Sequence, residues 1–113
     1  MAKIAVVEDN DAMREQLCGF IAQYARESGR QLDVTAFADG AEIVAPYRPG
    51  FDIIFLDIEM PTLGGMPTAE RIRQVDPDVV LVFVTNMAQY AIRGYEVDAL
   101  DFVLKPVSYY QFS

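Results

Sequence analysis

Histidine is missing from this sequence of 113 residues, and cysteine occurs once, as Cys18. Without histidine the chain cannot use imidazole acid–base catalysis, a Ser-His-Asp or Cys-His nucleophile pair, or histidine-ligated zinc. A single cysteine excludes an internal disulfide and fits a reducing compartment, so a cytoplasmic location is expected. The longest aliphatic run, residues 79–84, is far shorter than the ~20 residues of a membrane helix, and the run at 4–7 is too short for a signal peptide. No membrane segment is expected.

Basic residues are scarce as well. Nine Lys and Arg stand against seventeen Asp and Glu, which leaves a formal net charge of −8. Such an acidic chain repels polyphosphates and is not expected by itself to bind DNA or RNA through the phosphate backbone. Apolar residues make up 52% of the sequence, which is enough to form a core and excludes disorder. We expect one domain that spans residues 1–113.

Short apolar runs alternate along the chain with segments whose apolar residues recur every three or four positions. The runs predict buried strands at residues 3–7, 31–37, 51–56, 79–84 and 101–104. The segments predict helices at residues 13–24, 40–46 and 66–74, and a weaker one at 88–95. Asn10 or Asp11 can cap the first helix and Gly29 can end it, while Asp39 opens the second helix with a capping-box pattern.

Strands that alternate with helices are typical of βαβ units, which predicts a parallel sheet with helices on both faces. After Pro106 only about one helical turn of chain remains, so a fifth helix is expected to be cut short. Ligands of open α/β sheets bind outside the carboxyl ends of the strands. The residues at these ends therefore carry the functional prediction. Asp52 stands at a strand start and is expected at the opposite edge.

Polar residues follow four of the predicted strands. Glu8 and Asp9 follow the first strand, Asp57 the third, Thr85 the fourth and Lys105 the fifth. Two unit charges 4 Å apart repel by about 4 kcal/mol at an effective dielectric constant near 20, so three clustered carboxylates need a cation or a protonated member. All-oxygen ligands favour Mg²⁺, and a carboxylate beside it can attack phosphorus to form an aspartyl phosphate. Taken singly, each residue is more often a loop, cap or strand-end residue; their coincidence on one rim favours a site.

These motifs resemble the receiver domain of bacterial two-component response regulators. The match covers essentially the whole chain, in the family's order and spacing: Val7-Glu8-Asp9, residues 56–61, Gly65, Thr85 and Lys105-Pro106. Residues 90–102 are most similar to receivers of LytR/AgrA-type transcription regulators. In those proteins a C-terminal LytTR DNA-binding domain follows, and it is not part of these 113 residues.

The resemblance implies a flavodoxin-like, doubly wound sheet of five parallel strands in the order 2-1-3-4-5. It implies that Asp57 accepts a phosphoryl group from the phosphohistidine of a sensor histidine kinase, which supplies the imidazole that this chain lacks. It further implies that Mg²⁺ is bound directly by Asp9, Asp57 and the backbone carbonyl of Glu59, and through water by Glu8. The chain would then be a switch and no enzyme beyond its own phosphorylation and dephosphorylation.

The resemblance also assigns roles outside the acidic residues. Lys105 would pair with the phosphoryl oxygens, Thr85 would reorient toward them, and Phe102 would be the coupled aromatic switch. Gly65 would open the helix after the third strand, and the bond before Pro106 would be cis. Activation would change self-association of the output face, including homodimer formation. DNA would be contacted only through the LytTR domain.

Two other functions fit some of the same residues. A phosphatase of the haloacid dehalogenase type also uses an aspartyl nucleophile and Mg²⁺, as Asp57 with a downstream Thr and Lys suggests. Its nucleophile usually precedes the acidic pair, however, and its general acid would have to be Glu59 in place of the usual Asp. A phosphorylation-independent interaction scaffold would need the fold alone, and the joint presence of Asp9, Asp57, Thr85 and Lys105 argues against it.

Overall fold

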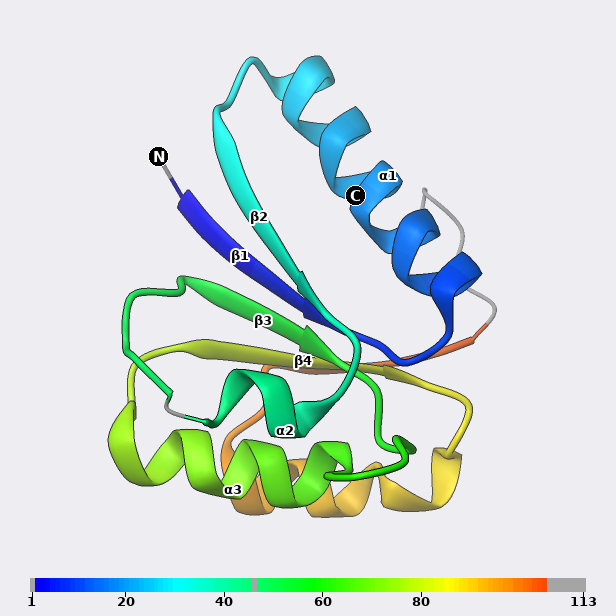
Figure 1. The fold of residues 1–113 in the computed structure, drawn as a ribbon, viewed down its shortest axis with the longest axis vertical. Coiled ribbons are helices and arrows are strands. Elements are labelled where there is room, and N and C mark those ends of the chain that lie inside the picture. Colours follow the sequence, from blue (N-terminus) through cyan, green and yellow to red (C-terminus); the bar gives the residue numbers. More distant parts are fainter. Residues whose placement is uncertain (1, 46, 106–113) are drawn as a thin grey trace.

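The computed structural model describes residues 2–45 and 47–105. Within these residues, five parallel strands form one sheet in the order β2-β1-β3-β4-β5, which confirms the predicted order (Figure 1). The strands are β1 (Ala2–Val7), β2 (Leu32–Phe37), β3 (Ile53–Leu56), β4 (Val80–Thr85) and β5 (Asp101–Leu104). The shortened fifth helix and the cis bond before Pro106 lie outside the described residues, so both stay predictions.

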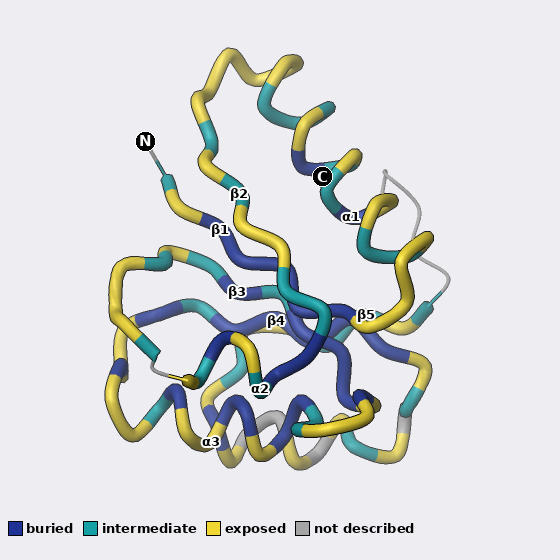
Figure 2. Tube along the Cα trace, in the orientation of Figure 1, coloured by how far each residue is buried: buried dark blue, intermediate teal, exposed yellow. Residues whose placement is uncertain are grey.

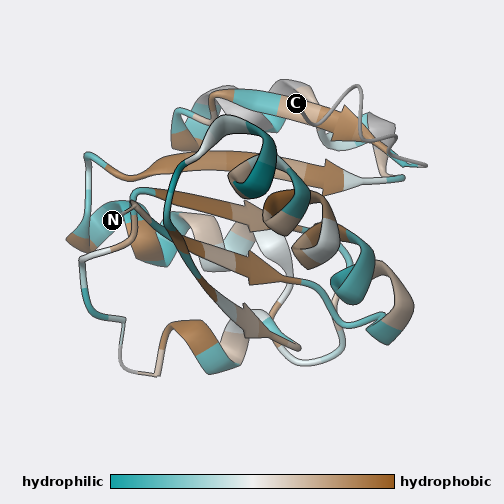
Figure 3. Cartoon of the chain, turned by 90° about the horizontal axis from the view of Figure 1, so that it is seen from above, coloured by the Kyte–Doolittle hydropathy of each residue, from teal (hydrophilic) through white to brown (hydrophobic). Residues whose placement is uncertain are grey.

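Helices cover both faces of the sheet. Helix α1 (Asp11–Ser28) lies on one face, and α2 (Gly40–Ile43) and α3 (Gly65–Val75) lie on the other (Figure 1). Apolar strand residues therefore face a core on each side, and the central strands are the most buried part of the chain (Figure 2). Figure 3 shows mostly hydrophobic strands between helices that carry both hydrophilic and hydrophobic residues. None of the described helices has the length and apolar character required to cross a membrane.

Helix α1 begins and ends as its sequence predicts. Asn10, one of the two candidate caps, accepts a 2.9 Å hydrogen bond from the backbone amide of Met13 through its side-chain oxygen. Gly29 ends the helix in the left-handed conformation, with φ of 70°, where a side chain would be disfavoured. Leu17 and Ile21 are the buried residues of the helix and join the core on this face. Only three residues separate the end of β1 from the start of α1, so the helix begins close to the carboxyl end of that strand.

The predicted helix at residues 88–95 is not an α-helix. The described chain forms two 3₁₀ segments there, η1 (Ala88–Tyr90) and η2 (Ile92–Val97). Gly94 lowers helix propensity in the middle of the segment. Arg73 at the end of α3 also takes the carbonyl oxygens of Val97 and Asp98, at 2.6 and 3.0 Å, as hydrogen-bond acceptors. The segment is thus held by a side chain from another element in addition to its own backbone turns.

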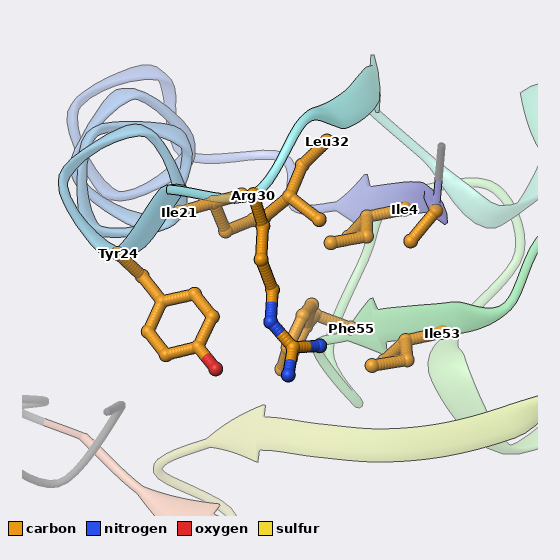
Figure 4. Close-up of a pocket in the computed structure, with 8 residues that line it drawn as sticks. Ile4, Ile21, Tyr24, Arg30, Leu32, Ile53 and Phe55 are labelled. Carbon is orange, nitrogen blue, oxygen red and sulfur yellow. The ribbon is translucent and has the colours of Figure 1, made fainter. Parts of the chain in front are cut away.

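A groove of about 280 Å³ opens between α1, the start of β2, and strands β1 and β3. Figure 4 shows its labelled lining residues, four of them aliphatic and the others an arginine, a tyrosine and a phenylalanine: Ile4, Ile21, Tyr24, Arg30, Leu32, Ile53 and Phe55. Among the described residues, its lining includes none of the predicted site residues at the strand ends.

Candidate functional site

The register of the sheet places the residues after β1 and β3 beside each other. Val7 pairs with Leu56, the last residue of β3. The next residues extend the ladder by one position, because Asp57 N donates to Val7 O at 3.1 Å and Glu8 N donates to Phe37 O at 3.0 Å. Both acidic side chains are thereby oriented by regular strand hydrogen bonds at the carboxyl edge of the sheet.

Three carboxylates and one ammonium group meet at this edge. Glu8 and Asp57 are buried, with 1% and 6% of their surface exposed, while Asp9 is exposed. One carboxylate oxygen from each of the three lies within 4.8 Å of the others. Lys105 Nζ lies 2.7 Å from Glu8 Oε1 and 2.8 Å from Asp57 Oδ2. The structure thus brings together four of the five predicted rim residues, Glu8, Asp9, Asp57 and Lys105, and we call these four the acidic cluster.

Burial and charge shift the pKa values of the acidic cluster. Burial raises the pKa of Glu8, and the neighbouring Asp57 adds to the rise, while Lys105 and the Asn10 amide oppose it without cancelling it. Burial by itself would lower the pKa of Lys105, but its contacts with Asp57 and Glu8 raise that pKa above its ordinary value. Lys105 is therefore a cation at neutral pH.

The acidic cluster has the donors of a divalent cation site. Glu8 Oε1 is buried and, among the described residues, receives no hydrogen bond of regular geometry, although the Lys105 ammonium lies close to it. Three carboxylates against one ammonium leave an excess of two negative charges when all are ionised. Oxygen donors of this kind select hard cations such as Mg²⁺. The residues present thus fit the cation that the sequence predicts.

Thr85 and Phe102 lie on the two strands next to the acidic cluster. Thr85 is fully buried, and its hydroxyl oxygen accepts a hydrogen bond from Met87 N at 3.2 Å. Its carbonyl accepts from Lys105 N at 2.9 Å, so the two residues are joined through their backbones. The half-buried Phe102 ring packs at a tilt against Phe83, with 6.0 Å between ring centroids.

The loop after β3 closes tightly around Asp57. Ile58 N donates to Asp57 Oδ1 at 2.7 Å, and Gly65 N donates to Ile58 O at 2.8 Å. A Cβ atom added to Gly65 would lie 2.1 Å from the carbonyl oxygen of Asp57, so only glycine fits there. The backbone carbonyl of Glu59, predicted as a metal ligand, belongs to this loop, and the Glu59 residue is exposed.

The contacts of two residues near the site were not predicted from the sequence. Arg14 donates to the carbonyl oxygen of Glu8 at 2.9 Å from the first turns of α1. Asp39 was expected only as a helix cap, but it also accepts hydrogen bonds from Thr62 and Leu63, in the loop after β3. Neither contact has a sequence signal, because each depends on where distant segments meet. Asp52 lies at the opposite edge of the sheet, as predicted, where it accepts from the backbone of Lys3 at 2.7 Å.

Comparison with known proteins decides the family. The model of the response regulator receiver domain matches residues 4–112. The chain belongs to this receiver family. It is 34% identical to the sensory transduction protein LytT of Bacillus cereus over 110 residues, which cover 94% of this chain and 42% of that protein. It is 30% identical to the transcriptional regulatory protein YpdB of Escherichia coli K12 over 106 residues, which cover 92% of this chain and 41% of that protein.

Solved receiver structures share the fold. The non-phosphorylated HemR receiver domain from Leptospira biflexa is 30% identical with a TM-score of 0.86, covering 99% of this chain and 88% of that one. The response regulator TrrA from Thermotoga maritima, in complex with Mg²⁺-BeF, is 26% identical with a TM-score of 0.79, covering 99% of this chain and 93% of that one. The receiver spans less than half the length of its curated relatives LytT and YpdB.

The family membership sets the general function. This chain is a receiver domain of a two-component response regulator, a signalling switch to which a phosphoacceptor role fits. Receiver domains bind Mg²⁺ at a group of acidic residues, and TrrA carries Mg²⁺-BeF in its solved structure. The phosphatase alternative loses its support, because the receiver family matches residues 4–112 whereas the likeness to phosphatases was limited to a few residues.

Proposed function

We propose that residues 1–113 form a receiver domain in which Asp57 accepts a phosphoryl group from a sensor histidine kinase. The supporting observation is the buried Asp57 carboxylate, with the Lys105 ammonium 2.8 Å from Oδ2 and the Ile58 amide 2.7 Å from Oδ1. Both contacts orient a carboxylate that would otherwise be costly to bury. The imidazole of the donor comes from the kinase, since the receiver has no histidine.

Glu8, Asp9, Asp57 and the backbone carbonyl of Glu59 would hold Mg²⁺. When bound, the ion neutralises charge on the carboxylates and on the phosphoryl oxygens. Lys105 turns from Asp57 Oδ2 to a phosphoryl oxygen, so that the ammonium group follows the negative charge from the carboxylate to the phosphate. The receiver thereby catalyses at most its own phosphorylation and dephosphorylation.

Thr85 and Phe102 would convert phosphorylation into a change of surface. The Thr85 hydroxyl accepts from Met87 N, and turning it toward a phosphoryl oxygen breaks this contact at the start of the β4–β5 connection. The Phe102 ring moves with it against Phe83. The altered surface would favour a homodimer. In the cytoplasm the full-length protein would control transcription through a C-terminal LytTR domain; the relative YpdB is likewise named a transcriptional regulatory protein.

Intact-mass spectrometry after incubation with acetyl phosphate and Mg²⁺ tests this function. We expect one phosphoryl adduct on the unmodified chain, none on Asp57→Asn, and one on the control variant Asp33→Asn, whose exposed carboxylate stands on β2. No turnover of phosphate monoesters is expected. A chain that stays unlabelled under conditions that label another receiver would contradict the proposal and favour the scaffold alternative.

A further inference from the structure

A buried carboxylate outside the acidic cluster holds the loop between β3 and α3. Asp39 ends the connection from β2 and is 8% exposed. Its Oδ1 accepts from the backbone amides of Ala41 and Leu63, each at 2.9 Å, and its Oδ2 accepts from the amide of Thr62 at 2.9 Å. Burial raises the pKa of Asp39, but these amides outweigh the burial and lower that pKa below its ordinary value. Asp39 is therefore ionised and bonded at both oxygens.

The same loop is fixed from its other side by α3. The Thr68 hydroxyl donates to Gly64 O at 2.7 Å. Next to Asp39, a Cβ added to Gly40 would lie 1.8 Å from Thr68 Oγ1 and 2.5 Å from Leu63 O. The start of α2 thus lies directly against the loop, at a separation that only glycine permits. Because α2 begins so close to the loop, the Asp39 carboxylate can accept hydrogen bonds from the loop amides.

The loop anchored by Asp39 contains the proposed backbone ligand of the cation. Ile58 is fixed by Gly65 N at 2.8 Å, and Thr62 is fixed by Asp39. Only three residues lie between these anchors, and Glu59 is one of them. Because both ends of this short stretch are held, the carbonyl of Glu59 is placed before any cation arrives.

We propose that Asp39 is a positioning residue for divalent-cation binding, acting through the loop that carries the Glu59 carbonyl. The inference rests on the proposed function of the acidic cluster. Helix capping alone does not explain the contacts, since α2 has four residues and capping uses only the Ala41 amide. The bonds to Thr62 and Leu63 instead join α2 to a loop 23 and 24 positions away. Groups that orient a metal ligand from outside typically change metal affinity about 10- to 100-fold when removed.

Two variants separate the loop contacts from the helix cap. Asp39→Ser keeps a capping hydroxyl at the start of α2 but is too short to reach the loop amides. Asp39→Asn keeps an acceptor for Ala41 and Leu63 but turns an amide donor toward Thr62 N. The control is Tyr47→Phe, which removes the 2.8 Å hydrogen bond from Tyr47 to Asp76 far from the acidic cluster.

Mg²⁺ dissociation constants from amide shift titrations, together with urea unfolding without Mg²⁺, give the result. We expect the constant to rise about 10-fold for Asp39→Ser and less for Asp39→Asn. Tyr47→Phe should lose stability with an unchanged constant. The proposal is overturned if the Asp39 variants bind Mg²⁺ as tightly as the unmodified chain does. It is also overturned if the ratio of lost Mg²⁺ affinity to lost stability is the same in Tyr47→Phe as in the Asp39 variants.

The failure of the proposed function has a different signature. If the unmodified chain binds no Mg²⁺, the acidic cluster is no cation site and both proposals fall, whereas unchanged binding in the variants overturns only the role of Asp39. If neither Asp39 variant folds, amide hydrogen exchange of the unmodified, metal-free chain decides. Protection of Thr62 and Leu63 comparable to that of α3 supports the proposal, and exchange at the rate of an exposed loop contradicts it.

Discussion

Lys105 Nζ donates a 2.8 Å hydrogen bond to Asp57 Oδ2 across 48 positions of sequence. The same ammonium lies 2.7 Å from Glu8 Oε1, so one cation serves two buried carboxylates. Removing one partner from such a buried group leaves uncompensated charge, which is costly in a medium of low dielectric constant. The stability of the receiver without metal therefore depends on a residue that its proposed function also requires.

Lys105→Met should lower the free energy of unfolding by about 2 kcal/mol without Mg²⁺, because Glu8 and Asp57 then repel each other without a counter-charge. Saturating Mg²⁺ should stabilise this variant more than the unmodified chain. Urea unfolding with and without Mg²⁺ measures both effects. The control Lys3→Met changes an exposed lysine and should stay within about 0.5 kcal/mol. Equal losses in the two variants would show that the ion pairs contribute nothing specific.

Gly65→Ala should destabilise the receiver by about 2 kcal/mol or more, since the added methyl group would lie 2.1 Å from the carbonyl oxygen of Asp57. Gly19→Ala is a matched control inside α1, where nothing lies within 4 Å of the added atom. It should stabilise the protein by up to about 1 kcal/mol through helix propensity. Denaturant midpoints compare the two, and a stable Gly65→Ala variant would mean that the loop around Asp57 is looser than described.

Mg²⁺ should raise the melting temperature, and a chelator should reverse the rise. A ligand at 100 times its dissociation constant stabilises the folded state by about 2.7 kcal/mol. Asp9→Asn should abolish most of this gain with little effect on the metal-free protein, because Asp9 is exposed. Asp33→Asn should retain the full gain. A melting temperature that is independent of Mg²⁺ would rule out the cation site.

The stability that Asp39 contributes should disappear in acid. Its pKa is lower in the folded protein than the value of about 3.9 in the unfolded chain. The carboxylate therefore stabilises the fold above about pH 4, and this contribution is lost as the pH falls through the folded-state pKa. Urea unfolding should show a difference between the unmodified chain and Asp39→Asn that is largest near neutral pH and shrinks below about pH 4. A stability difference that stays constant with pH would contradict a lowered pKa for Asp39 in the folded protein.

Local patterns predicted most of the elements. The spacing of apolar residues located the strands to within about two residues and the middle of α1, while the Asn10 and Gly29 signals marked the ends of α1 correctly. The predicted helix at 88–95 formed two 3₁₀ segments instead; Gly94 lowers helix propensity within it, and Arg73 holds the carbonyls of Val97 and Asp98 at its far end. A side chain from a distant helix competes with local propensity, and no pattern within the segment reveals it.

The candidate site was predictable for a simple geometric reason. In a parallel sheet all carboxyl ends meet at one edge, so residues that follow apolar runs, such as Glu8 and Asp57, are neighbours whatever their separation in sequence. The supporting contacts of Arg14 and Asp39 were not predictable. They join a helix or a turn to backbone atoms of another loop, and backbone atoms carry no sequence information.

The order of apolar runs and polar strand ends in these 113 residues determined which elements form and which side chains reach one edge, because hydrophobic period and strand polarity are local properties. Tertiary structure alone decided that Lys105 touches both Glu8 and Asp57, that Gly65 has no room for a side chain, and that Asp39 holds the loop beside the acidic cluster. Those relationships depend on strand register and on packing distances of a few ångströms, which arise only when the whole chain is folded.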